Sequence, residues 1–282
     1  MLDQIRVVIS IGLVMLLLLL RLESEQFGAA EYDESDNRFK PGLSRRLSWY
    51  AIGLLLLAGL YVVHPKPHED LYLVLGQRGD ILLYGLLLAV VGMAQAAAFS
   101  FWHYRRLRLP PAAAYPGAGI NDIMTAVIDE ATFRGAILGL LLVVHVPVVA
   151  AVMAQAVLYA LVTRLGAPGR HPYMLLLSLG IGLACGWATI RTGGIGAAII
   201  GHAMTSYALF VFSGHAGQIV LRGKEPEEIE RGRRAPDGWQ DVRRLRPRPH
   251  SNVTAEPRGL SRAATSGVAS AASAGGKGRE RR

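Results

Sequence analysis

The chain has 282 residues, 51% of them hydrophobic, and a formal net charge of +9 at pH 7. The apolar residues are gathered in long runs, which excludes an ordinary soluble domain and favours a protein that crosses the membrane several times. The single cysteine, Cys185, excludes an intrachain disulfide and a metal site built from cysteines alone.

Seven apolar segments follow one another, each about long enough to cross a hydrocarbon core of roughly 30 Å as a helix. We predict helices over residues 4–20, 47–63, 81–102, 120–144, 147–163, 173–190 and 195–213. The expected fold class is therefore all-α, a polytopic bundle of about seven transmembrane helices. The first segment has no convincing small-residue cleavage site after it, so we expect an uncleaved anchor.

The positive charge is concentrated after the last apolar segment. From Leu221 onward, fifteen Lys and Arg residues stand against eight Asp and Glu residues. Because residues 216–282 show no periodic apolar pattern, we expect a disordered basic tail, suited to contact with anionic lipid and without a nucleic-acid partner. Arg105, Arg106 and Arg108 fall on the same side as the tail if the segments cross in turn. This places the tail in the cytoplasm, at a bacterial-type inner (plasma) membrane.

Three ionisable residues stand inside the fourth apolar segment: Asp129, Glu130 and Arg134, in the sequence DEATFRG. A charge at the centre of a membrane costs about 2.5–3.5 kcal/mol on insertion scales, so such residues usually face the bundle interior and serve a function. Glu130 and Arg134 are four residues apart and can pair, whereas Asp129 points about 100° away. Two carboxylates in different environments suit acid–base chemistry, with a purely structural ion pair as the alternative.

His202 and Ser206 are also four residues apart and share one face of the last apolar segment. Counted from the expected cytoplasmic ends of their helices, Asp129 lies about 14 Å deep and His202 about 16 Å deep. We therefore expect the acidic pair and the histidine to share one layer. A simple hydrogen bond from His202 to a neighbouring helix is the alternative.

These residues resemble the motifs of the CAAX prenyl endopeptidase and bacteriocin-processing (CPBP, or Abi) family of intramembrane proteases. The family's first motif is Glu-Glu-x-x-x-Arg, usually followed by Gly. The stretch from Asp129 to Gly135 is similar to it, with Asp at the first position. The family's last motif is a His followed four residues later by Asn or a similar residue, and His202 with Ser206 matches it. The resemblance covers about residues 118–213.

The family's middle motif is an aromatic residue followed four residues later by His. Here Tyr159 takes the aromatic position, but Thr163 stands where His is expected, and His145 lies at the opposite membrane face. The resemblance implies that a carboxylate activates a water molecule, which attacks a peptide carbonyl. The implied catalytic residues are Asp129 as the base, Glu130 and Arg134 as its support, Thr163 at the middle position, and His202 with Ser206 on the oxyanion side.

The resemblance implies an intramembrane endopeptidase of the glutamic type, cutting near the C-terminus of a protein or peptide substrate in the lipid bilayer. Since Thr163 cannot accept a proton near neutral pH, a catalytically weakened relative that binds a membrane partner is the alternative. A proton-coupled carrier that uses the buried acids and His202 is a third hypothesis. Thr163 also removes a second histidine ligand, so we expect no bound metal and no cofactor. The predicted division is N-terminal helices and loops over 1–117, a CPBP-like core over 118–215 and the tail over 216–282.

Overall fold

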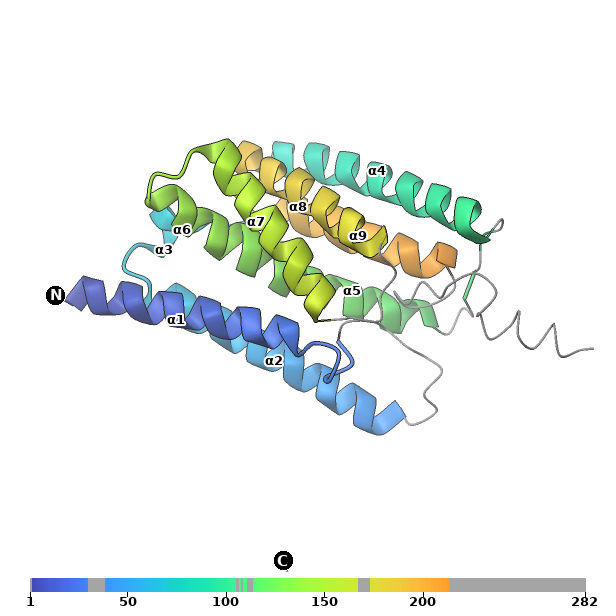
Figure 1. Cartoon of the computed structure of the whole chain (residues 1–282), viewed down its shortest axis with the longest axis horizontal. Coiled ribbons are helices and arrows are strands. Elements are labelled where there is room, and N and C mark those ends of the chain that lie inside the picture. Colours follow the sequence, from blue (N-terminus) through green and yellow to red (C-terminus); the bar gives the residue numbers. More distant parts are fainter. Residues whose placement is uncertain are drawn as a thin grey trace, which may run out of the picture. The chain divides into compact units, whose positions relative to one another are not determined.

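The computed structural model describes residues 2–29, 39–104, 107, 109–110, 114–166 and 173–213. These residues contain helices and no strand, which confirms the predicted all-α class (Figure 1). All the helices fall within one unit, Met1–Glu230. The predicted tail, 216–282, and the basic residues Arg105, Arg106 and Arg108 lie outside the described residues.

The helices run through the chain in an order that matches the apolar segments of the sequence. Their bounds are α1 Leu2–Leu22, α2 Phe39–Val63, α3 Pro67–Asp70, α4 Arg78–Tyr104, α5 Ala114–Glu130, the π-helix η1 Ala131–Ile137, α6 Leu138–Val143, α7 Val148–Leu165, α8 Tyr173–Thr192 and α9 Gly196–Ser213.

Within the described residues, six helices are long and apolar enough to cross a membrane: α1, α2, α4, α7, α8 and α9. The remaining predicted segment, 120–144, is covered by α5, η1 and α6. These three elements follow one another without a break, because Glu130 and Leu138 at the two joints keep helical backbone angles. The acidic residues and Arg134 make this segment less apolar than the others. The prediction of about seven spans is therefore confirmed, and the chain is a multi-pass membrane protein.

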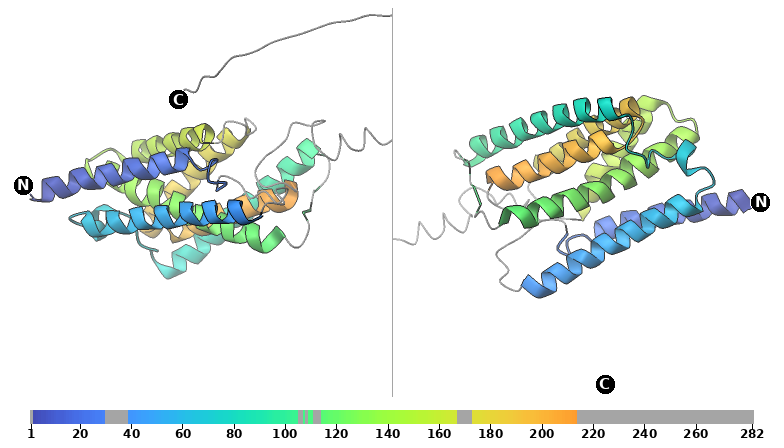
Figure 2. Two further views of the ribbon diagram at one scale, coloured as in Figure 1. Left: turned by 90° about the horizontal axis from the view of Figure 1, so that it is seen from below. Right: turned by 180° about the vertical axis from the view of Figure 1, so that it is seen from behind.

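The central position in the bundle belongs to η1. Figure 2 (right) shows α4, α9, α5 and the α1–α2 pair side by side in that order, and each of these neighbours packs against the next. The paired helices α7 and α8 lie across them, and η1 contacts α1, α7 and α8. The charged residues predicted as a site are thus surrounded by helices from both halves of the chain.

The α7–α8 pair approaches closely because α8 has glycine at the contact. A Cβ atom built on Gly182 would lie 2.8 Å from the Cβ atom of Ala156 and 2.9 Å from its Cα atom. Next to this contact the buried Gln155 donates a hydrogen bond to the Gly182 carbonyl at 2.8 Å. Small residues are the usual means by which helices approach in a membrane, where no water drives them together.

The extended segment Leu71 to Gln77 forms backbone hydrogen bonds both with η1 and with the turn between α8 and α9. The Tyr72 N–H donates to the Gly135 carbonyl of η1 at 3.0 Å, and the Ile195 N–H donates to the Val74 carbonyl at 2.9 Å. A π-helix leaves backbone groups outside the usual ladder, and these groups need partners when water is absent. The segment supplies such partners and holds the α8–α9 turn against the centre of the bundle.

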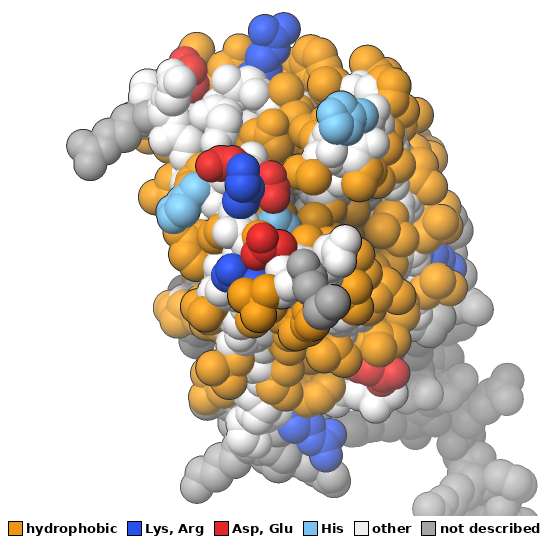
Figure 3. Space-filling view, turned by 90° about the vertical axis from the view of Figure 1, so that its left-hand side faces the viewer, with side chains coloured by type: hydrophobic (Ala, Val, Ile, Leu, Met, Phe, Trp, Pro, Cys, Tyr) orange, Lys and Arg blue, Asp and Glu red, His pale blue; other side chains and the backbone are white. Residues whose placement is uncertain are grey.

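The end of α2 carries a buried histidine. His64 is 2% exposed, and its Nδ1 accepts a hydrogen bond from the Lys66 N–H at 3.3 Å and lies 3.7 Å from Asp70 Oδ2. Burial lowers the pKa of His64, and this effect outweighs the opposing effect of the Asp70 carboxylate. Figure 3 shows this side of the molecule, where charged and histidine side chains gather within a largely apolar surface.

We expect Gly182→Ala to lower the melting temperature of the purified protein, because overpacking a tight contact costs about 1–3 kcal/mol. Gly180→Ala is the matched control in the same helix, since a Cβ atom there meets no atom within 4 Å. That variant should be neutral or slightly stabilising, as alanine is the better helix former. Thermal unfolding in detergent measures the melting temperatures of both variants, and equal values for the two would contradict the packing described.

Acidification should destabilise the protein through His64. Because its pKa is lowered in the folded state, the stabilisation is present above the unfolded pKa of about 6.5 and is lost as pH falls through the folded pKa. We expect the melting temperature to fall between about pH 7.5 and about pH 5, and to fall less steeply in His64→Gln. Identical pH dependence of the two proteins would rule out this contribution.

Candidate functional site

The site begins where α5 passes into the π-helix η1. Asp129 and Glu130 are the last two residues of α5, and Arg134 lies within η1, all of whose residues are buried. The Arg134 Nη1 atom lies 3.1 Å from Glu130 Oε1, and both side chains are fully buried. The pairing expected from their spacing is therefore present, although this part of the helix has π rather than α geometry. Single turns of π-helix are common at functional sites, because they redirect side chains.

Glu130 also contacts the predicted histidine of α9. The distance from Glu130 Oε1 to His202 Nδ1 is 2.7 Å, and that from His202 Nε2 to the Tyr159 hydroxyl oxygen is 3.1 Å. With Glu130 ionised and His202 neutral, Nδ1 donates to the carboxylate and Nε2 accepts from the tyrosine hydroxyl. Three elements, α5, α9 and α7, thus meet in one buried hydrogen-bonded chain.

Tyr159 contacts both Arg134 and His202. The guanidinium carbon of Arg134 is 4.3 Å from the centre of the Tyr159 ring. The ring also packs edge-on against Phe133, with 5.1 Å between centroids. Cation–π and aromatic contacts of this kind fix the orientation of the tyrosine, so its hydroxyl is held toward His202.

Asp129 turns to a partner that the sequence did not suggest. Its Oδ1 lies 3.0 Å from the Nε atom of Arg21, the second-last residue of α1, and both side chains are buried. Arg21 also donates to the Ser24 hydroxyl at 2.8 Å. The only signal for Arg21 in the sequence is its place as the basic residue that ends a long apolar run. Arginine in that position usually marks a membrane edge, so the pairing follows only from the packing of α1.

The two remaining predicted residues differ in their surroundings. Thr163 is buried on α7, one turn from Tyr159, and its Oγ1 atom has no hydrogen-bond partner in the described residues. Ser206 is half-buried, and in the described part of the chain no hydrogen bond joins it to another predicted site residue. Its neighbour Thr205 is buried and donates to the Gly201 carbonyl at 2.7 Å. The structure therefore joins three of the six predicted residues directly, Glu130, Arg134 and His202. It pairs Asp129 with Arg21 and leaves Thr163 and Ser206 without a hydrogen bond to another predicted residue among those described.

Several buried polar atoms of the site lack hydrogen-bond partners among the described residues. Among them are Glu130 Oε2, Asp129 Oδ2, Thr163 Oγ1 and the three guanidinium nitrogens of Arg134. Buried polar groups in proteins are normally hydrogen-bonded, so these atoms are suited to a polar partner such as water. Within the described residues, no group of three or more His, Cys, Asp or Glu side chains is arranged to hold a metal ion.

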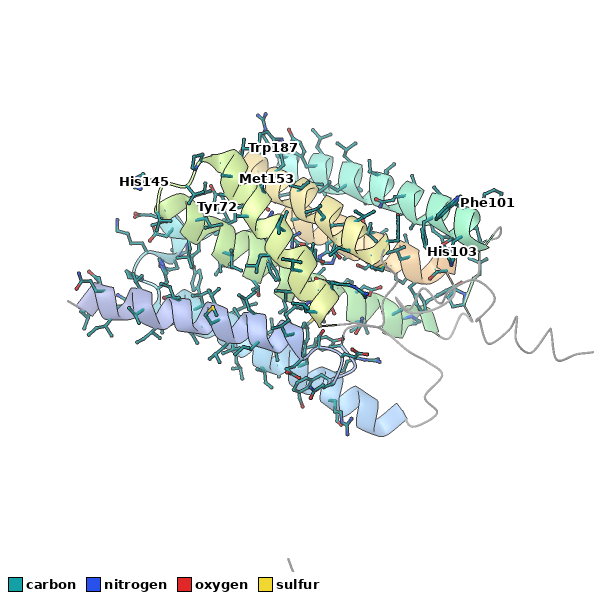
Figure 4. All side chains as sticks on the ribbon, viewed as in Figure 1. Tyr72, Phe101, His103, His145, Met153 and Trp187 are labelled. Atoms are coloured by element: carbon teal, nitrogen blue, oxygen red, sulfur yellow. The ribbon has the colours of Figure 1, made fainter. Side chains whose placement is uncertain are left out.

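His145 lies apart from the site. Figure 4 shows it in the turn between α6 and α7, at the end of the molecule opposite to Phe101 and His103. Its backbone φ angle is +63°, which belongs to the turn rather than to a helix. It does not fill the role of the histidine that Thr163 replaces.

We expect Arg21→Gln and Asp129→Asn each to lower the melting temperature strongly, because an unpaired buried charge costs about 3–5 kcal/mol. The double variant should recover much of this loss, since neither charge is then left alone. Arg6→Gln is the control on the same helix, because Arg6 is partly exposed and bonds only to backbone carbonyls and a weakly placed Asp3. Additive losses in the double variant would show that the pair makes no energetic contribution.

The part of the chain that holds most of this cluster is similar to a known protein family. Residues 111–208 match the model of the family described as type II CAAX prenyl endopeptidase, Rce1-like. The match spans η1, α7 and α8 and contains Asp129, Glu130, Arg134, Tyr159, Thr163, His202 and Ser206, but not Arg21. Among curated proteins and among solved structures, none matches the chain. Residues 111–208 of the chain therefore form an Rce1-like domain of the CAAX prenyl endopeptidase (CPBP) type.

Proposed function

We propose that this protein is an intramembrane endopeptidase of the glutamic type that hydrolyses a peptide bond near the C-terminus of a protein or peptide substrate. The family supplies the general activity of a membrane protease. The observation that carries the finer proposal is the 2.7 Å contact between Glu130 Oε1 and His202 Nδ1, made between helices and inside a fully buried site. A buried carboxylate that orients an imidazole is a common element of hydrolytic centres.

Each carboxylate has its own role in this proposal. Asp129 is held on one side by Arg21, while its Oδ2 atom has no partner among the described residues and is free to accept a hydrogen bond from the attacking water. Glu130 orients His202, and Arg134 offsets its negative charge. In water-excluded surroundings such fixed charges act strongly on a reacting group.

A catalytically weakened protein that binds a membrane partner is the second candidate function. The observation that favours it is the Arg21–Asp129 pair. Together with the Arg134–Glu130 pair, it gives each buried carboxylate a guanidinium partner, so two positive side chains balance two negative ones. Thr163 also favours this second candidate function, because its hydroxyl does not serve as a base near neutral pH. In this case the same cluster would bind a peptide segment without cleaving it.

We expect Glu130→Gln and His202→Ala to reduce cleavage by at least about 10²-fold, the usual effect of losing acid–base assistance. The assay uses the full chain in liposomes with membrane-anchored reporter peptides. Glu69→Gln and His68→Ala are matched controls, because Glu69 pairs with Lys66 and His68 with the Tyr61 hydroxyl, both at the exposed end of the bundle.

The controls should cleave as the wild type does. Equal cleavage by all five proteins would exclude the proposed site. A folded wild type that binds reporter peptides without cleaving them, and that gains cleavage on Thr163→His, would favour the second candidate function.

A further inference from the structure

A carboxylate, an imidazole and a hydroxyl follow one another at the centre of the site. Glu130 Oε1 lies 2.7 Å from His202 Nδ1, and His202 Nε2 lies 3.1 Å from the Tyr159 hydroxyl. With Nδ1 protonated by its contact to the carboxylate, Nε2 presents a lone pair to the Tyr159 O–H. This is the order of groups in which a histidine can remove a proton from a hydroxyl while the carboxylate stabilises the resulting imidazolium.

Charged groups surround the Tyr159 side chain on several sides. Arg134 lies over the ring, at 4.3 Å from its centre, and Asp129, Arg21 and Glu130 also act electrostatically on the hydroxyl. The guanidinium groups stabilise negative charge on the phenolic oxygen, whereas burial and the two carboxylates oppose it. The middle motif of the family that the sequence resembles requires only an aromatic residue at position 159. The motif therefore does not account for the Tyr159 hydroxyl.

Tyr159 also lies where the missing histidine would act. Tyr159 and Thr163 are four residues apart on the buried face of α7, so their side chains are neighbours. Thr163 does not accept a proton near neutral pH, and Asp129 contacts Arg21 through Oδ1, with Oδ2 left to bind the attacking water. His202 Nε2 is the imidazole nitrogen that contacts the Tyr159 hydroxyl, so a proton leaving Tyr159 has an acceptor there.

We propose that Tyr159 is a further catalytic residue, which carries the proton of the attacking water to His202 in place of the histidine absent at position 163. The inference rests on the proposed endopeptidase function. As the water oxygen bonds to the peptide carbonyl carbon, a water proton passes to the Tyr159 oxygen and the Tyr159 proton passes to His202 Nε2. When the C–N bond breaks, the proton returns from Nε2 through Tyr159 to the leaving nitrogen. The products are a carboxylic acid and an amine, and the relay ends in its starting state.

Tyr159→Phe tests this role, since it retains the ring over which Arg134 lies and removes only the O–H. Its matched control is Tyr50→Phe, which removes another buried tyrosine hydroxyl, bonded to Asn121 Oδ1 at 2.6 Å. In the liposome assay we expect Tyr159→Phe to lower kcat by about 10²–10⁴-fold with KM within about twofold of wild type. Tyr50→Phe should keep the wild-type kcat, although both variants lose a similar amount of thermal stability.

A second substitution separates the relay from a structural role. Thr163→His, introduced into Tyr159→Phe, should restore at least about 10-fold of the lost kcat, because the imidazole then supplies the base directly. A wild-type kcat in Tyr159→Phe would overturn this inference and leave the proposed function standing. Equal losses of kcat in the two Tyr→Phe variants, or no rescue by Thr163→His, would also overturn it. Absence of cleavage by the folded wild type would overturn the proposed function itself, and the catalytic role of Tyr159 with it.

Discussion

Charge compensation inside an apolar bundle is the constraint on which this protein's arrangement depends. Two carboxylates and two guanidinium groups are buried in the layer where α1, α5, η1, α7 and α9 meet. Each charge would be costly alone in a lipid-facing position, so each must find a partner on a packed neighbour. Glu130 satisfies this requirement twice, through Arg134 on its own helix and through His202 on α9. The need to pair these groups therefore fixes which faces of the helices turn inward.

Two adjacent acidic residues acquire different surroundings because of helix geometry. Asp129 and Glu130 point about 100° apart, so their side chains turn toward different neighbouring helices. One meets a guanidinium from α1, and the other meets an imidazole from α9. This separation gives the cluster one carboxylate that pairs with an arginine of α1 and one that contacts a histidine of α9. Enzymes commonly divide acid and base roles between paired carboxylates in this way.

Parts of the chain outside the family match contribute to the same centre. The match begins at residue 111, yet Arg21 comes from α1, and the extended segment Leu71 to Gln77 bonds to η1 and to the α8–α9 turn. Gly166, which ends α7, lies so close to α1 that a Cβ atom there would be 2.7 Å from the Arg21 carbonyl oxygen. The first helix is thus packed against the turn that follows Thr163. Its arginine belongs to the site and is more than a membrane-edge residue.

Hydropathy and spacing alone determined the helical class, the positions of the long helices and the pairing of Glu130 with Arg134, because these follow from local periodicity and from the cost of charge in lipid. Equal depth also led to the expectation that the acidic pair and His202 share a layer. The π geometry of η1, the reach of Arg21 to Asp129 and the contact of Tyr159 with His202 were decided only by tertiary structure. Each depends on which helices are neighbours and how they are rotated, and helix periodicity and depth do not specify either for segments 43 or 108 residues apart.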